Sequence, residues 1–71
     1  MNTRRQTKLV REGAYVAEVE VELIEAEEEW GPYLSLDDAR KLDGAREALR
    51  LGDVEKAGKL GKVYRLMPIA V

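Results

Sequence analysis

Apolar and acidic residues alternate along residues 15 to 23 in a pattern typical of a β-strand with one buried face. The segment reads YVAEVEVEL, with apolar residues at every odd position and three glutamates among the even ones. Because successive side chains of a strand point to opposite faces, the odd residues are predicted to form a core. The same alternation predicts that Glu18, Glu20 and Glu22 face solvent.

A second strand-like run at residues 7 to 11 precedes this segment, and Glu12-Gly13 between the two runs indicates a β-hairpin. Two lengths of connection are possible. A two-residue turn at Glu12-Gly13 would place polar and basic residues of the first strand, including Lys8 and Arg4, beside the apolar stripe of the second. That register is unfavourable for a strand with a buried face.

A three-residue loop at residues 11 to 13, with its glycine in the left-handed conformation, gives the other register. It pairs Leu9 with Tyr15 on the apolar face and sets Arg4 against Glu20 on the solvent face. Opposite charges facing each other across two strands are worth a few tenths of a kcal/mol each. We therefore predict the three-residue loop.

Residues 34 to 61 carry the signals of two consecutive helices. Ser35 is a predicted N-cap, and Asp38 three residues later is placed to close a capping box. Gly52 ends the first helix and Asp53 caps the second. The apolar residues of the first helix recur at helical spacing: Leu36, Ala39, Leu42, Ala45 and Leu49. Three glycines in these helices lower helix propensity, and close packing is one explanation for their presence: Gly44, Gly58 and Gly61.

Residues 62 to 67 are again strand-like, and Pro68 limits how far a strand can continue. Two strands alone are marginal in water, so this run is predicted to return to the hairpin as a third strand. The apolar segment at residues 69 to 71 is expected to pack into the core or across a homodimer interface. The sequence thus predicts one α+β domain over residues 1 to 71, with residues 1 to 6 as a flexible basic arm.

The composition argues against catalysis and against a bound metal or cofactor. The chain of 71 residues contains no cysteine and no histidine, so the usual zinc ligands, thiol nucleophile and near-neutral general base are missing. The acidic residues Asp37, Asp38 and Asp43 do not match a calcium-loop spacing, and the glycines do not form a phosphate-binding motif. No apolar run approaches the roughly 20 residues needed to cross a bilayer, so we expect a cytoplasmic protein.

Charge is sorted along the chain although the net charge is only −2. Residues 1 to 11 have four basic groups and no acid, whereas residues 12 to 29 have eight glutamates and no base. Such asymmetry concerns binding partners rather than fold. We expect a basic protein partner to bind acidic residues and two aromatic anchors: Glu18, Glu20, Glu22, Glu25, Glu27, Glu28, Glu29, Trp30 and Tyr33.

Nucleic-acid binding is the alternative, carried by the basic residues Arg4, Arg5, Lys8 and Arg11. The adjoining glutamates oppose this role because they would repel phosphate groups. A basic arm that reaches past those glutamates could still grip a nucleic acid.

Three stretches together resemble a family of short bacterial proteins that occur in gene pairs of the toxin and antitoxin kind. They are KLVREGAYVAEVEVELIE, WGPYLSLDDARKLDGAREALRLGD and KVYRLMPIAV, and they cover nearly the whole chain. The resemblance implies a small antitoxin-like protein that masks a basic, RNA-cutting partner. A hairpin ahead of the helices departs from ribbon-helix-helix order, which argues against DNA autoregulation through that fold.

Overall fold

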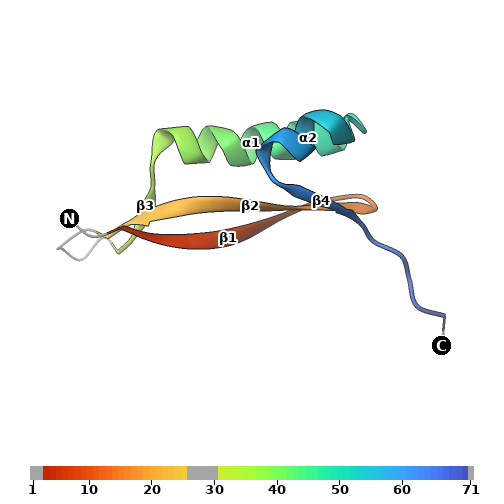
Figure 1. Ribbon diagram of the computed structural model, residues 1–71, viewed down its shortest axis with the longest axis horizontal. Helices are drawn as coiled ribbons and strands as arrows, with labels where there is room; N and C mark the ends of the chain where they lie inside the picture. The colour runs from red at the N-terminus through yellow and green to blue at the C-terminus, as the bar shows by residue number, and fades with distance from the viewer. Residues whose placement is uncertain (1–2, 26–30, 71) are drawn as a thin grey trace.

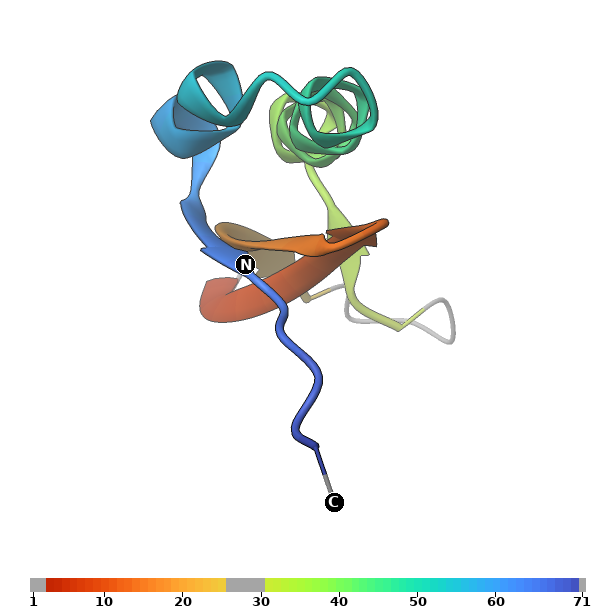
Figure 2. The same ribbon diagram turned by 90° about the vertical axis from the view of Figure 1, so that its right-hand side faces the viewer.

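A four-stranded antiparallel sheet and two helices form two layers, which confirms the predicted α+β class (Figure 1). The computed structural model describes residues 3–25 and 31–70. The order of its elements is β1 (Thr3–Glu12), β2 (Tyr15–Ile24), β3 (Tyr33–Leu34), α1 (Leu36–Arg50), α2 (Val54–Leu60) and β4 (Lys62–Arg65). Both helices lie side by side over the same face of the sheet, as Figure 2 shows.

The long strand β2 organises the sheet. β1 pairs with it along one edge, while β3 and β4 pair with opposite ends of its other edge. β4 is the predicted third strand, and it adds antiparallel to residues 15 to 18. β3 has only two residues and was not expected from the sequence.

The hairpin register differs from the three-residue loop that the sequence favoured. Glu12 pairs with Tyr15, so the turn consists of Gly13 and Ala14 alone. Gly13 has a φ of 60°, whereas Ala14, like every described residue other than glycine, has no positive φ. A positive φ at the first central position alone defines a type II′ turn, and glycine is the usual residue there. This turn matches the right-handed twist of the two strands, and that preference sets the register.

The observed register, compared with the predicted one, also changes which side chains of β1 face the helices. Val10 lies opposite Ala17 and is buried, whereas Lys8 lies opposite Val19 and is half-buried. The sequence argument rejected polar residues on this face because it took the whole face to be core. In the structure, Gln6 and Arg4 on the same face are exposed, so the face of an edge strand need not be apolar along its full length.

The core is made of small and β-branched side chains between β2 and the helices. All four odd residues from Ala17 to Leu23 of β2 are buried, which confirms the predicted buried face. The core cluster consists of Val10, Ala17, Val19, Val21, Ala45, Ala48, Leu49 and Ala57. Leu36 was expected on the apolar stripe of the first helix, but it is 65% exposed because it lies in the first turn beyond the core.

The helix caps follow the sequence with one exception. Ser35 accepts a hydrogen bond from the backbone N–H of Asp38 at 3.1 Å, and Asp53 accepts one from Lys56 at 3.1 Å. The carboxylate of Asp38 does not close a capping box. It accepts a hydrogen bond from the backbone N–H of Glu22 in β2 at 2.8 Å instead.

Two of the three glycines in the helical half have a packing reason. A Cβ on Gly44 would lie 3.1 Å from the Leu60 side chain, and one on Gly61 would clash with the backbone of Glu18. A Cβ on Gly58 would meet nothing within 4 Å, so close packing does not explain that residue.

Both ends of the described chain depart from expectation. Residues 3 to 6, assigned to a flexible arm, are instead part of β1, and residues 1 and 2 lie outside the described residues. Beyond β4 the chain runs away from the sheet (Figure 1), and Met67 and Ile69 are 77% and 86% exposed. The expectation that the segment at residues 69 to 71 packs into the core of the same chain is therefore wrong for residues 69 and 70, and residue 71 lies outside the described residues. A dimer contact stays a prediction.

Candidate protein-binding surface

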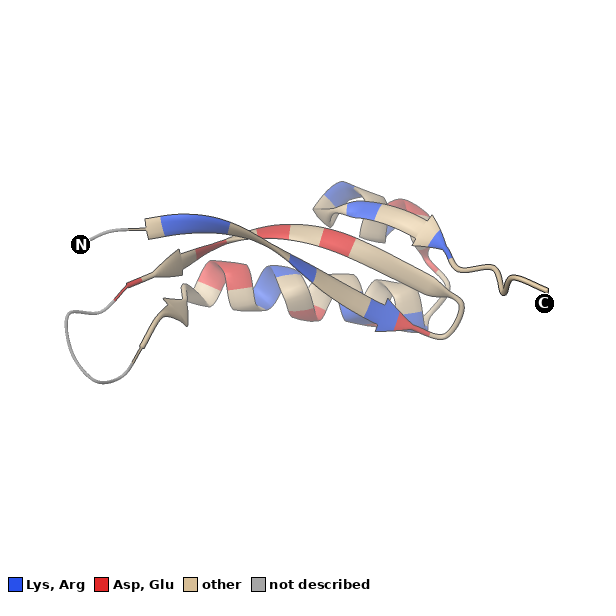
Figure 3. Cartoon of the chain, turned by 90° about the horizontal axis from the view of Figure 1, so that it is seen from below, with Lys and Arg blue, Asp and Glu red and all other residues tan. Residues whose placement is uncertain are grey.

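The glutamates of β2, red on the strand in Figure 3, alternate with the buried residues that face the helices. They therefore lie on the face of the sheet that no described helix covers, which we call the helix-free face. Glu20 and Glu22 are exposed and Glu18 is half-buried, in agreement with the alternation in the sequence. Alternating geometry places the odd residues of β1 on this same face. The pairs across the two strands are Arg5 with Glu22, Thr7 with Glu20 and Leu9 with Glu18, so Glu20 does not face Arg4 as predicted.

The edge of β2 away from β1 has a gap between its two short partner strands. β4 pairs with residues of β2 up to Glu18, and β3 pairs with residues from Leu23 onward, so residues 19 to 22 have no strand beside them there. Side chains of α1 occupy the gap: Asp38 accepts from the Glu22 N–H, and the Lys41 ammonium donates to the Glu20 carbonyl oxygen at 3.0 Å. Two helical side chains thus satisfy backbone groups that a strand would otherwise pair.

Replacing Asp38 with alanine is expected to cost about 1 kcal/mol more than replacing Asp37 with alanine. Both variants lose an acid from the first turn of α1, and so lose the same favourable interaction with the helix dipole. Only Asp38→Ala also loses the hydrogen bond to Glu22. Urea unfolding of the two variants measures the difference, and equal losses of stability would mean that this bond contributes nothing.

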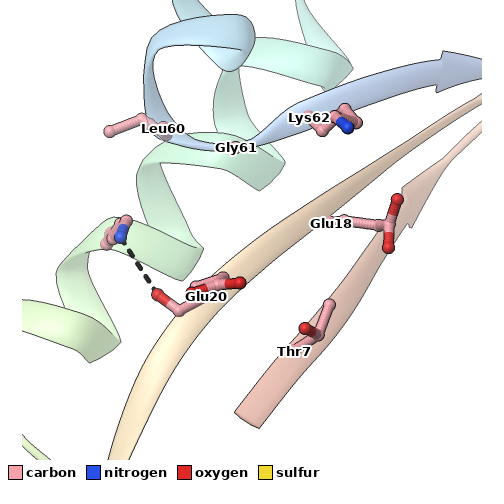
Figure 4. Close-up of a pocket in the computed structure, with 7 residues that line it drawn as sticks. Thr7, Glu18, Glu20, Leu60, Gly61 and Lys62 are labelled. Carbon is pink, nitrogen blue, oxygen red and sulfur yellow. Dashed lines mark hydrogen bonds between the residues drawn. The ribbon is translucent and has the colours of Figure 1, made fainter. Parts of the chain in front are cut away.

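Two hollows flank this gap and share Glu20 and Lys41. The smaller, of about 260 Å³, lies between β2 and the start of β4 (Figure 4). The larger, of about 450 Å³, lies beside the first turn of α1 and contains four carboxylates and two basic groups. Its lining residues are Arg5, Glu20, Glu22, Ser35, Asp37, Asp38 and Lys41.

Sequence reasoning found Glu20 and Glu22 but missed the two aspartates beside them. Asp38 was interpreted as the residue that closes a capping box in the first helical turn, and both aspartates were otherwise considered only as calcium ligands, whose spacing they do not match. The fold brings this turn against the edge of β2, so Asp38 both forms part of the helix start and lines the larger hollow. We call Glu20, Glu22, Asp37 and Asp38 the acidic edge.

The two predicted sets of charged residues are neighbours in space. Arg5 approaches Glu20 to 3.7 Å, and Arg4 approaches Glu25 to 3.4 Å. Three of these side chains are well exposed and that of Glu25 is 44% exposed, so the ion pairs add little to stability and can exchange with other partners. The basic residues therefore do not form a separate arm, because they line the same sheet as the glutamates.

Tyr64 of β4 extends the helix-free face beside Glu18. It pairs with Val16, while its neighbour Lys62 pairs with Glu18. A hydrogen bond to the Glu18 carboxylate raises the pKa of Tyr64 above its ordinary value of 10.0, and partial desolvation and the negative charge of Glu18 act in the same direction.

Glu18→Gln is therefore expected to lower the pKa of Tyr64, because the variant removes the carboxylate that favours the neutral phenol. A raised pKa means that the folded state holds the proton more tightly. This contribution to stability is complete below pH 10.0 and is lost as the pH rises through the raised value. Phenolate absorbance in alkaline titration measures the shift, with Glu55→Gln as control, and an unchanged titration would show that Glu18 is not the cause.

The remaining predicted binding residues are placed as follows. Glu25 follows β2 and is half-buried, and Tyr33 lies in β3 with 48% of its surface exposed. Glu27, Glu28, Glu29 and Trp30 lie outside the described residues.

Neither a metal site nor a membrane span is found in the described part of the chain. Over residues 3–25 and 31–70 the acidic residues form no group of three that could hold a metal ion. No helix in those same ranges is long and apolar enough to cross a membrane.

Comparisons with known proteins do not add to this description. No protein-family model matches the chain, and neither a curated protein nor a solved structure matches it.

Proposed function

We propose that this protein is a small, non-catalytic protein-binding module that recognises a basic segment of a partner protein through its acidic edge. The observation that supports the proposal is the larger hollow, where carboxylates from β2 and from the first turn of α1 converge on one open space. A more specific form of the proposal is an antitoxin-like role. The partner would then be a basic RNA-cutting protein whose positively charged surface is masked.

The charges of the hollow suit a basic partner that carries several cationic groups. Four carboxylates face two basic groups, and one of these, Lys41, is already bonded to the Glu20 carbonyl. The other, Arg5, is held only by an exposed ion pair that an incoming arginine or lysine can replace. An acidic surface of this kind raises the rate of encounter with a cationic partner, and it does so less at high salt.

The product of the neighbouring gene is the first partner to test, by titration calorimetry at low and high salt. Glu20→Lys with Glu22→Lys is expected to weaken binding by at least about tenfold, because favourable contacts become repulsive. The matched control is Glu47→Lys with Glu55→Lys, which changes the net charge equally on exposed helix positions away from the hollow. If both double variants lose affinity equally, net charge rather than the acidic edge governs binding. If neither loses affinity, the acidic edge is not the binding surface.

A further inference from the structure

The outer edge of β1 is a long, regular strand edge with no partner among the described residues. All ten residues from Thr3 to Glu12 pair one to one with β2, so the strand has no bulge. It also contains no proline. Bulges and prolines are common ways in which proteins prevent an edge from accepting another strand, and β1 has neither.

The hydrogen bonds of β2 show which groups of β1 are free. Glu22 and Glu20 direct their backbone groups away from β1, to Asp38 and Lys41. The N–H and C=O of one strand residue point to the same side, so the odd residues of β2 bond to β1. Their partners are the even residues of β1. The odd residues, Arg5, Thr7 and Leu9 among them, therefore present N–H and C=O groups outward.

The side chains along this edge are mainly basic. Arg5 and Arg11 lie on the helix-free face, and Arg4 and Lys8 lie on the other. No ion pair of Lys8 or Arg11 is formed within the described residues. An added strand with acidic residues would thus meet positive charge on either face, while its backbone pairs with the free groups of β1.

We propose that the outer edge of β1 binds an extended acidic segment of another protein as an additional strand of the sheet. This site runs along the outer edge of β1, whereas the acidic edge lies across β2, and it selects the opposite charge. Arg5 is the one residue that also lines the larger hollow. A second copy of β1 is a poorer occupant because the strand has four basic residues and one acid, so two copies repel each other. Nucleic acid is also disfavoured, since Glu18, Glu20 and Glu22 lie on the adjoining strand and repel phosphate.

The test uses an eight-residue peptide of alternating threonine and glutamate with blocked ends, followed by amide exchange in NMR. The peptide is expected to slow exchange at the outward amides of Arg5, Thr7 and Leu9. A peptide with lysine in place of glutamate should not bind. A glutamate peptide N-methylated at alternate residues should not bind either, because it cannot form the ladder.

Thr7→Pro removes one outward N–H and leaves the bonds between β1 and β2 intact, since prolines are tolerated at such edge positions. It is expected to weaken peptide binding by about tenfold or more, whereas the control Thr7→Ala keeps the N–H and keeps the affinity. Should Thr7→Pro fail to fold, the N-methylated peptide decides the question on the unaltered protein.

Several results would overturn the proposal. They are equal binding of the N-methylated peptide, protection confined to residues outside β1, and tighter binding of a single-stranded oligonucleotide that competes with the peptide. Dimerisation through β1 in the absence of peptide would also overturn it. Glu20→Lys with Glu22→Lys should not weaken the glutamate peptide, so failure at this edge is distinguishable from failure at the acidic edge.

Discussion

Gly61→Ala is expected to destabilise the fold by about 2–3 kcal/mol, at the upper end of the cost of overpacking a close contact. A Cβ at this position would clash with the Glu18 carbonyl oxygen and lie 3.0 Å from a methyl group of Val19. The obstacle is backbone, which cannot move aside as a flexible side chain could. Gly61 joins α2 to β4, so relief of the clash would shift β4 away from β2.

Thermal or urea unfolding measures this effect, and Gly58→Ala is the matched control. Gly58 lies inside α2 with open space around its Cα, so alanine there should stabilise the helix by up to about 1 kcal/mol. A domain of this size has a free energy of unfolding of roughly 4–10 kcal/mol, so the two variants should separate clearly in their transitions. Equal stability of the two variants would show that the α2–β4 connection does not pack against Glu18.

Val19→Ala is expected to cost about 2–3 kcal/mol, from lost burial of two methyl groups and from the cavity that remains. Val19 is fully buried beneath the helices, and it is one of the two largest side chains with almost no exposed surface. Val16 is the control in the same strand because it lies on the helix-free face and is only half-buried.

The same substitution at the control site, Val16→Ala, should cost less than about 1 kcal/mol, because little apolar surface is lost from contact. Unfolding in urea compares the two variants, and similar slopes would show that both unfold from the same compact state. A larger loss for Val16→Ala than for Val19→Ala would mean that the faces of β2 are assigned the wrong way round.

Features that depend on neighbouring residues were predictable from the sequence. The alternation in β2 gave its buried face, Ser35 and Asp53 marked the two helix starts, and Gly52 lies between the helices as expected. In each case the physical cause acts within a few residues of the signal: a period of two in a strand, or a side chain that bonds the first turn of a helix.

Features that depend on how segments meet were not predictable in the same way. Charge pairs across the hairpin are worth only a few tenths of a kcal/mol each, and the twist preference of the turn at Gly13 and Ala14 decides the register instead. An edge strand such as β1 also does not need an apolar face along its full length.

The candidate site also depends on how distant segments meet, and this could not be predicted from the sequence. Alternating glutamates indicate exposure, but the sequence does not indicate that the first turn of α1 returns to the edge of β2. Asp38 was recognised as a residue of a helix start, and its bond to Glu22 sixteen residues away depends on the tertiary fold. Short strands such as β3 also give too few residues for any period to be read.

The register of β1 on β2 underlies the proposed strand-binding edge, because it sets which amides of β1 point outward and which of its side chains share the helix-free face. Cross-strand Hα–Hα contacts in NMR report it directly, since they are short for the pairs that do not exchange hydrogen bonds. Strong contacts are predicted between Thr7 and Glu20 and between Leu9 and Glu18. A contact between Thr7 and Ala17 in their place would indicate a three-residue loop. The outward amides of β1 would then be those of even residues, which would contradict the proposed edge at Arg5, Thr7 and Leu9.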